Sequence, residues 1–201
     1  MITLTKSQIE FLYHADEMLS ARMASKKKRY IHSTLVAKTA CKLADLYDVN
    51  VFDALTAGLL HDWDKVLEND DLLMRATKYG INLGDAPLDC LPLLHGPVAS
   101  YELPHIFPEV SSEITHAIAV HTTGCLNMTP LDMVIFVADA IEPNRNGESI
   151  ETLRNMAGNV CLEELFFQTF VSGLVYVLKS RRHLYKGALP VYNAYAERRN
   201  N

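Results

Sequence analysis

Hydrophobic residues recur at helical spacing along almost the whole chain, and no hairpin dipeptide separates alternating strands. A capping-box pattern at Thr5 and Gln8 opens a first helix. Its expected inner face is marked by residues at helical spacing, of which one is polar: Ile9, Leu12, Tyr13, Asp16 and Leu19. A second helix is expected from about residue 29 to 47. The pattern predicts an all-α fold.

Caps and helix breakers bound the remaining elements. Asn50 is a good N-cap for a third helix, which is expected to carry His61 and Asp62 in its C-terminal half. Glycine and proline are too frequent between residues 80 and 110 for one long helix, so this stretch is predicted to be irregular, with short helical pieces. We expect the tail, residues 190–195, to dock back through its tyrosines. Further helices are expected at about 112–120, from Thr129-Pro130 onward, at 149–157 and at 162–182.

Composition and charge narrow the class of protein. A chain of 201 residues with 49% hydrophobic and 21% charged residues can bury one sizeable core. The net charge of −5 argues against broad nucleic-acid binding, which usually needs a basic face. The four cysteines are scattered, which indicates free thiols in a reducing compartment. With no membrane-length apolar run and no signal-peptide pattern, the expected location is the cytoplasm.

His61 and Asp62 place an imidazole beside a carboxylate in an apolar stretch of the chain. A buried charge costs several kcal/mol unless it is paired or bound to a metal. Taken alone, the two residues could simply form a hydrogen-bonded helix pair. Imidazole with carboxylate is also a standard ligand combination for a borderline divalent ion, so the pair points to a metal.

Four more residues of the same ligand types lie beside apolar or turn-forming segments. They are His32, His95, His121 and Asp139. One metal needs about four to six ligands, so this number of histidines and aspartates suits two metals bridged by a shared carboxylate. His95 and His121 each precede a glycine-containing turn, where a histidine could also cap a helix or face water.

Five motifs follow one another between residues 29 and 145. They are Arg29-x-x-His32, His61-Asp62-x-x-Lys65, Leu94-His95-Gly96-Pro97, His121-Thr122-Thr123-Gly124 and Ala138-Asp139-x-x-Glu142-Pro143-x-Arg145. The chain thereby resembles the HD-domain metal-dependent phosphohydrolase superfamily, and within it the bacterial YqeK family of symmetrical diadenosine tetraphosphate hydrolases. Asp64 departs from this pattern, because a small or apolar residue is expected there. The resemblance implies a single HD-type helical domain over residues 1–201, with a metal-site core at about 29–145 and C-terminal helices at about 148–201.

The resemblance also implies a reaction, the symmetrical cleavage of diadenosine tetraphosphate into two ADP by a metal-bound hydroxide. It favours a dinuclear site holding two divalent transition-metal ions, preferably iron, with Asp62 bridging them. The remaining ligands would be His32, His61 and Asp139 for one ion, and His95 and His121 for the other. Asp62 and Lys65 are the expected catalytic residues.

Cationic and hydroxyl side chains in the same motifs are candidates for substrate binding. Lys65 lies one helical turn after His61, where the resemblance implies a phosphate contact and the alternative is a solvated lysine. Arg29 and Arg145 could each supply a forked donor for phosphate, although spacing alone assigns neither. Thr122 could bond phosphate or sugar, or merely shape its turn.

Two other functions fit part of the pattern. One is an HD phosphohydrolase for another nucleotide, such as a deoxynucleoside monophosphate or a guanosine alarmone. The other is a non-catalytic HD regulatory module, although such a module would usually have lost one or more ligands. The expected partner is a dinucleoside polyphosphate, with no nucleic acid and no membrane. A homodimer is compatible with the sequence, which does not fix the oligomeric state.

Overall fold

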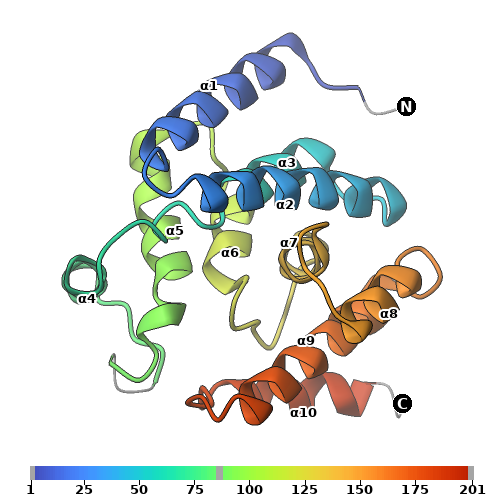
Figure 1. The fold of residues 1–201 in the computed structure, drawn as a ribbon. Coiled ribbons are helices and arrows are strands. Elements are labelled where there is room, and N and C mark those ends of the chain that lie inside the picture. The colour runs from blue at the N-terminus through green and yellow to red at the C-terminus, as the bar shows by residue number, and fades with distance from the viewer. Residues whose placement is uncertain (1–2, 85–87, 199–201) are drawn as a thin grey trace.

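The computed structural model describes residues 3–84 and 88–198, and every regular element in these ranges is helical. This confirms the predicted all-α class (Figure 1). The elements are α1 Lys6–Arg22, α2 Lys27–Leu46, α3 Val51–Leu60, α4 Asn69–Lys78, the 3₁₀ turn η1 Leu91–Leu93, α5 His95–Ile106, α6 Ser112–Val120, α7 Pro130–Ile141, α8 Glu148–Met156, α9 Leu162–Lys179 and α10 Ala188–Arg198. Among the helices described, none combines the length and the apolar character needed to cross a membrane.

Helix α7 lies at the centre of the molecule and is seen end-on in Figure 1. Helices α2, α3 and α6 pack against it, and so do α8 and α9. The sequence of α7 is apolar around most of the helix circumference, as expected for a helix that is buried on several sides. Its one acidic residue near the C-terminal end, Asp139, is therefore carried into the interior of the helical assembly.

Helices α2 and α3 approach each other closely because small residues line their contact. A Cβ atom placed on Gly58 would lie 2.8 Å from the Cα atom of Ala37 and 3.3 Å from the Cβ atom of Ala40. No larger side chain fits at that position without a shift of the backbone. The close approach brings the end of α3 next to α2, the helix that carries His32.

The predicted caps are present. Thr5 and Gln8 form the capping box of α1, and the Asn50 side chain accepts hydrogen bonds from the backbone at the start of α3. Thr129 caps α7 in the same way, with Asp132 as its capping-box partner. These side chains satisfy backbone N–H groups that a helix leaves without internal partners. The caps explain why the sequence predicts where these helices begin.

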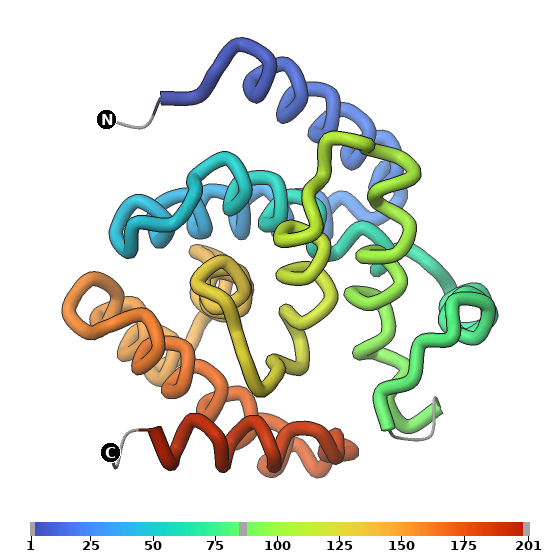
Figure 2. Tube along the Cα trace, turned by 180° about the vertical axis from the view of Figure 1, so that it is seen from behind, coloured from blue at the N-terminus to red at the C-terminus, as the bar shows by residue number. Residues whose placement is uncertain are grey.

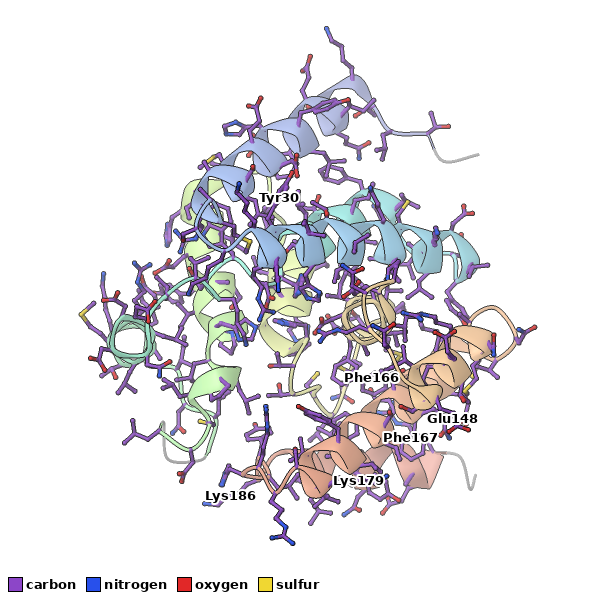
Figure 3. All side chains as sticks on the ribbon, in the orientation of Figure 1. Tyr30, Glu148, Phe166, Phe167, Lys179 and Lys186 are labelled. Atoms are coloured by element: carbon purple, nitrogen blue, oxygen red, sulfur yellow. The ribbon has the colours of Figure 1, made fainter. Side chains whose placement is uncertain are left out.

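The buried face of α1 is rotated from the predicted one. Ile9, which was expected to face the core, is 42% exposed, and Leu12 is only partly buried. Phe11 sets the orientation instead, because its ring packs edge-on against Phe52 and Phe107 at centroid distances of 5.6 and 5.9 Å. The polar residue Asp16 then faces α2, where the Tyr30 hydroxyl donates to its carboxylate at 3.0 Å. Figure 3 shows Tyr30 between α1 and α2. The residues of α1 that the core buries are Phe11, Ala15 and Leu19, and of these Leu19 was predicted.

Two predictions about the middle of the chain were wrong. No described helix spans residues 80–110, and η1 is a short helical piece as predicted, but residues 95–106 form one continuous helix where an irregular stretch was expected. Pro97 is tolerated because it occupies the first turn, where its missing N–H would have no helical partner. Pro104 lies inside the helix, where it removes one backbone donor, and the helix ends two residues later. In addition, α3 ends at Leu60, so His61 and Asp62 lie in the turn that follows rather than in the helix.

The C-terminal helices close the end of the molecule opposite α1. Figure 2 shows α10 lying along α9 at this end. Phe166 of α9 points toward α7, and its ring centroid lies 5.0 Å from that of Phe136 (Figure 3). The tail docks as predicted, because Tyr195 is buried and its hydroxyl accepts a hydrogen bond of 2.9 Å from the backbone N–H of Met128.

Candidate metal centre

The structure brings together all six residues that were predicted as metal ligands. They come from α2, from the turn after α3, from the first residue of α5, from the end of α6 and from α7. Their possible ligand atoms form two groups that share His61, and within each group the atoms lie within 4.8 Å of one another. One group is His32, His61 and Asp139, and the other is His61, Asp62 and His121. His95 joins the second group through its contacts with Asp62 and His121.

The carboxylate of Asp62 lies between two sets of imidazoles. Its Oδ2 atom is 3.7 Å from the Nε2 atoms of both His32 and His61. Its Oδ1 atom is 3.0 Å from Nε2 of His95 and 4.0 Å from Nε2 of His121. Each oxygen therefore faces a different set, which is the orientation that a bridging carboxylate needs.

All four imidazoles present the same ring nitrogen to the centre, because each Nδ1 atom lies at an oxygen. The pairs are His61 with the Gly58 carbonyl at 2.8 Å, His95 with the Pro92 carbonyl at 2.9 Å, His121 with the Ile118 carbonyl at 2.6 Å, and His32 with the Glu142 carboxylate at 3.2 Å. When Nδ1–H donates to such an oxygen, Nε2 keeps its lone pair for a metal ion.

The donor set fits a divalent metal ion. The Nε2 atom of His61 is buried and has no hydrogen-bond partner among the described residues. Leaving a buried polar atom unpaired costs about 1 to 3 kcal/mol, so such an atom calls for an explanation. Neutral imidazole nitrogens together with carboxylate oxygens are ligands for borderline divalent ions, and a metal would satisfy this atom.

Electrostatics favour the metal-binding protonation states of His61, His121 and both aspartates. At His32, the contacts with Asp139, Asp62 and Glu142 outweigh burial and raise the pKa. Burial lowers the pKa of His61, and burial together with the neighbouring His95 and His61 lowers that of His121 to about 3. Burial alone would raise the pKa of Asp62, yet the surrounding histidines hold it well below its usual range. For Asp139, the hydrogen bond to His32 and the nearby charges likewise outweigh burial and lower the pKa. Neutral imidazoles and ionised carboxylates are the forms that bind metals.

Glu142 is a residue of the site to which the sequence analysis gave no role. Its carboxylate is 2% exposed, and it accepts hydrogen bonds from Nδ1 of His32 and from the backbone N–H of Asn144 at 2.6 Å. Glu142 follows Asp139 by three residues, a spacing that places two side chains on the same face of a helix. That spacing was a usable signal, since a histidine ligand usually needs a partner for its second nitrogen.

Arg154 of α8 closes the end of α7, and nothing in the sequence motifs indicated this. Its guanidinium donates to the backbone carbonyls of Ile141, Glu142 and Arg145 at 2.9, 2.6 and 2.8 Å, and it also pairs with Glu151. Carbonyls at a helix end lack partners within the helix. Arg154 therefore fixes the turn in which Glu142 and Arg145 lie.

The predicted substrate-binding cations surround the cluster. Arg29 donates to Asp62 Oδ2 at 2.9 Å, and Arg145 donates to Asp139 Oδ1 at 2.7 Å. Lys65 donates to the Pro92 carbonyl at 3.2 Å, and its Nζ atom lies 3.1 Å from Nδ1 of His95. Burial and the two arginines lower the pKa of Lys65, although Asp62 and Asp139 oppose them. The fourth candidate, Thr122, has a buried hydroxyl with no partner among the described residues.

Asp64, the departure from the family motif, has a local counterion. Its side chain is fully buried and pairs with the guanidinium of Arg22 in α1. Arg22 also donates to the Trp63 carbonyl at 2.8 Å and stacks over the Trp63 ring at 4.8 Å. The negative charge of Asp64 is thus compensated from α1, and the contact anchors the turn that carries Asp62 and Lys65.

Comparison with known proteins gives consistent matches. Residues 29–144 match the family described as HD domain. The chain is 32% identical over 179 residues to the "Bis(5'-nucleosyl)-tetraphosphatase, symmetrical" of Staphylococcus aureus, covering 87% of this chain and 91% of the relative. A Bacillus subtilis protein of the same name is 30% identical over 168 residues, covering 82% and 88%. A crystal structure from Clostridium acetobutylicum, of a "predicted HD superfamily hydrolase involved in NAD metabolism", superposes with a TM-score of 0.83 at 29% identity, covering 90% of this chain and 97% of that one.

Proposed function

Because this chain belongs to the HD-domain family, together with relatives named symmetrical bis(5'-nucleosyl)-tetraphosphatases, we propose that it hydrolyses diadenosine tetraphosphate into two ADP. The observation that carries this proposal is the position of Asp62 between two sets of imidazoles, each set facing one carboxylate oxygen. All six ligand-type positions are filled, which argues against a module that has kept the fold and lost the chemistry. The similarity to the tetraphosphatases extends over most of both chains, which favours their substrate over another nucleotide.

Two divalent metal ions are proposed as the cofactors, with Asp62 holding both. His32, His61 and Asp139 would complete one set of ligands, and His95 and His121 would belong to the other. When bound, such ions supply an activated water near neutral pH and positive charge for the phosphoryl oxygens. The nitrogen and oxygen donors suit several transition metals, and the family resemblance leads us to propose iron.

The cations around the cluster are proposed to bind the polyphosphate. The side chains of Arg29 and Arg145 are 39% and 44% exposed, so each guanidinium contacts a carboxylate of the cluster and still faces solvent. Guanidinium groups recognise phosphate through paired N–H donors, and fixed positive charge stabilises charge that develops on phosphoryl oxygens. Lys65 lies beside His95, where its ammonium group can donate hydrogen bonds at the edge of the cluster. The unpaired hydroxyl of Thr122 is a further candidate donor.

A basic segment beside the cluster offers a route for a polyanion. Residues 24–29 line a cavity of about 510 Å³. Arg29, the last of these residues, contacts Asp62 of the metal centre. Lys26 donates to the Val66 carbonyl at 3.0 Å, so this lysine also fastens the start of α2 to the turn after α3. Lys27 and Lys28 are the remaining cations of the segment, and they can draw in a polyphosphate while the molecule as a whole is acidic.

Chromatographic analysis of products tests the reaction. The reconstituted protein is incubated with diadenosine tetraphosphate and, separately, with deoxynucleoside monophosphates and guanosine alarmones. We expect ADP as the only product of the dinucleotide and little turnover of the other nucleotides. The formation of AMP with ATP, or rapid hydrolysis of a mononucleotide while the dinucleotide stays intact, would refute the proposal. An Asp62→Ala variant serves as the inactive control.

Elemental analysis tests the metal content. We expect close to two transition-metal ions per chain at this cluster, with iron prominent when the protein is kept reduced and unstripped. His95→Ala or His121→Ala should lower the content toward one ion, because each removes a ligand from one side of Asp62. A fully reconstituted wild-type protein that saturates with a single ion would overturn the dinuclear arrangement.

A further inference from the structure

A second group of ligand-type side chains lies away from the metal centre. In the part of the chain that the structure describes, His116, Cys125 and Asp132 offer a nitrogen, a sulfur and an oxygen that all lie within 4.8 Å of one another. His116 precedes His121 by five residues on α6, and Asp132 precedes Asp139 by seven residues on α7. At a rise of about 1.5 Å per residue, these offsets separate the group from the metal centre by about 7.5 and 10.5 Å along the two helices.

The carboxylate of Asp132 is pre-oriented within this group. Its side chain is fully buried, its Oδ2 atom accepts from the backbone N–H of Thr129 at 2.7 Å, and its Oδ1 atom faces Nδ1 of His116 at 3.0 Å. The capping bond fixes one oxygen and leaves the other directed at the histidine. Metal-binding carboxylates are commonly held in this way by a hydrogen bond to the oxygen that is not a ligand.

Two sulfur atoms complete the set of donors. The Sγ atom of Cys125 lies 3.7 Å from the Sδ atom of Met128, in the loop that joins α6 to α7. Two sulfurs on one tetrahedral ion, each bonded at about 2.3 Å, are about 3.8 Å apart, so the observed spacing needs almost no adjustment. Thiolate, thioether and imidazole are soft or borderline ligands, which select d¹⁰ ions such as Zn²⁺ over Mg²⁺ or Ca²⁺.

We propose that His116, Cys125 and Asp132, with Met128 as a further sulfur ligand, form a separate binding site for a zinc-class cation. An ion can enter because the side chain of His116 is 46% exposed and that of Cys125 is partly exposed. The three chemical types of donor distinguish the site from the catalytic cluster, whose six residues include no sulfur. This proposal does not depend on the proposed hydrolase activity.

The site would add a shared ion to three elements that otherwise meet through packing and the His116–Asp132 contact. Its ligands come from α6, from the α6–α7 loop and from the first turn of α7. The backbone N–H of Met128 also bonds the hydroxyl of Tyr195 in α10, so the same loop already anchors the C-terminal helix. A bound cation would therefore stabilise the connection between α6, which His121 directly follows, and α7, which carries Asp139.

Cadmium titration tests the site because a cadmium–thiolate bond gives an ultraviolet charge-transfer band, whereas histidine and aspartate ligands give none. Full-length, metal-stripped protein is titrated with Cd²⁺ under a non-thiol reductant. We expect a saturable band equal to one thiolate per chain, which added Zn²⁺ displaces. Cys125→Ser should abolish the band, and His116→Asn should weaken Cd²⁺ binding at this site by roughly tenfold or more. The control Cys161→Ser, which changes an exposed cysteine outside the group, should leave the band intact.

The outcomes separate the proposal from adventitious thiol binding. If the wild type gives no saturable band, or if Cys125→Ser keeps it, the proposal is overturned. If Cys161→Ser abolishes the band instead, the thiolate belongs to another site and the proposal also fails. Circular dichroism establishes that each variant is folded, and if Cys125→Ser is not, the His116→Asn titration decides.

Discussion

Substitution of Glu142 by glutamine should disturb the orientation of the proposed ligand His32 while leaving that ligand in place. The carboxylate accepts from both His32 Nδ1 and the Asn144 backbone N–H, whereas an amide has only one oxygen to accept either bond. Losing a buried hydrogen bond to a charged group costs about 1.5 to 3 kcal/mol. Loss of such a partner of a metal-bound histidine typically reduces affinity or activity about 10- to 100-fold. At about 1.36 kcal/mol per tenfold this corresponds to about 1.4 to 2.7 kcal/mol, so the two magnitudes agree.

The assay is kcat/KM on diadenosine tetraphosphate together with metal content at limiting metal. Glu142→Gln should lower kcat/KM about 10- to 100-fold, and excess metal should restore part of the loss, because His32 itself remains. Arg154 should still close α7, since it bonds the backbone carbonyl of Glu142 rather than the side chain. Glu148→Gln, an exposed glutamate at the start of α8, is the matched control. Wild-type kcat/KM and metal affinity in Glu142→Gln would refute the role assigned to this carboxylate.

Three further predictions address the cation, the packing and the charge near the cluster. Lys65→Ala should keep both metals and lower kcat/KM about 10²- to 10³-fold, whereas unchanged kcat/KM would leave Lys65 as a structural lysine. Gly96→Ala should lower the free energy of unfolding in urea by about 1 to 3 kcal/mol, because its Cβ would lie 2.6 Å from the Ile118 carbonyl oxygen. Gly173→Ala, where nothing lies within 4 Å, should not destabilise the protein. Burial raises the pKa of Asp64 to about 6, so the folded state holds a proton that the unfolded chain releases near pH 4, and stability should fall as pH rises between these values. In urea unfolding of the metal-free protein, the free energy of unfolding of Asp64→Asn should fall less over this pH range than that of the wild type. An equal fall in both proteins would contradict the role assigned to Asp64.

Helix starts were predictable because local side chains determine them. Thr5, Asn50 and Thr129 each bond backbone N–H groups within three residues, and such caps are legible in sequence. The face of α1 was not predictable in the same way, because Phe11 turns inward to meet Phe52 and Phe107, which come from distant parts of the chain. Local patterns therefore located the elements, while tertiary contacts set their rotation.

The residues of the candidate site fall into the same two groups, those that local sequence motifs predict and those whose role depends on tertiary contacts. The motifs named the six ligand-type residues, and the structure brings them together, because each motif joins a ligand to the turn or helix end that presents it. Arg154 had no such signal, since its role depends on α8 packing across the end of α7. Pro97 misled the prediction for α5 because proline disrupts a helix interior but is tolerated in the first turn, and Pro104 is accommodated inside the helix two residues before its end.

The four histidines differ in how easily a mutation elsewhere in the chain can disturb the orientation of their rings. His61, His95 and His121 each donate to a backbone carbonyl three residues earlier, and a substitution at that earlier position still leaves a carbonyl in the chain. His32 instead relies on a carboxylate 110 positions away in sequence. In a library of random single substitutions, three of the four rings should therefore keep their orienting partner, and Glu142 should stand out as a position outside the six ligands that tolerates little change. The local turns thus make most of the site's geometry robust to sequence drift, and they concentrate its fragility at one distant residue.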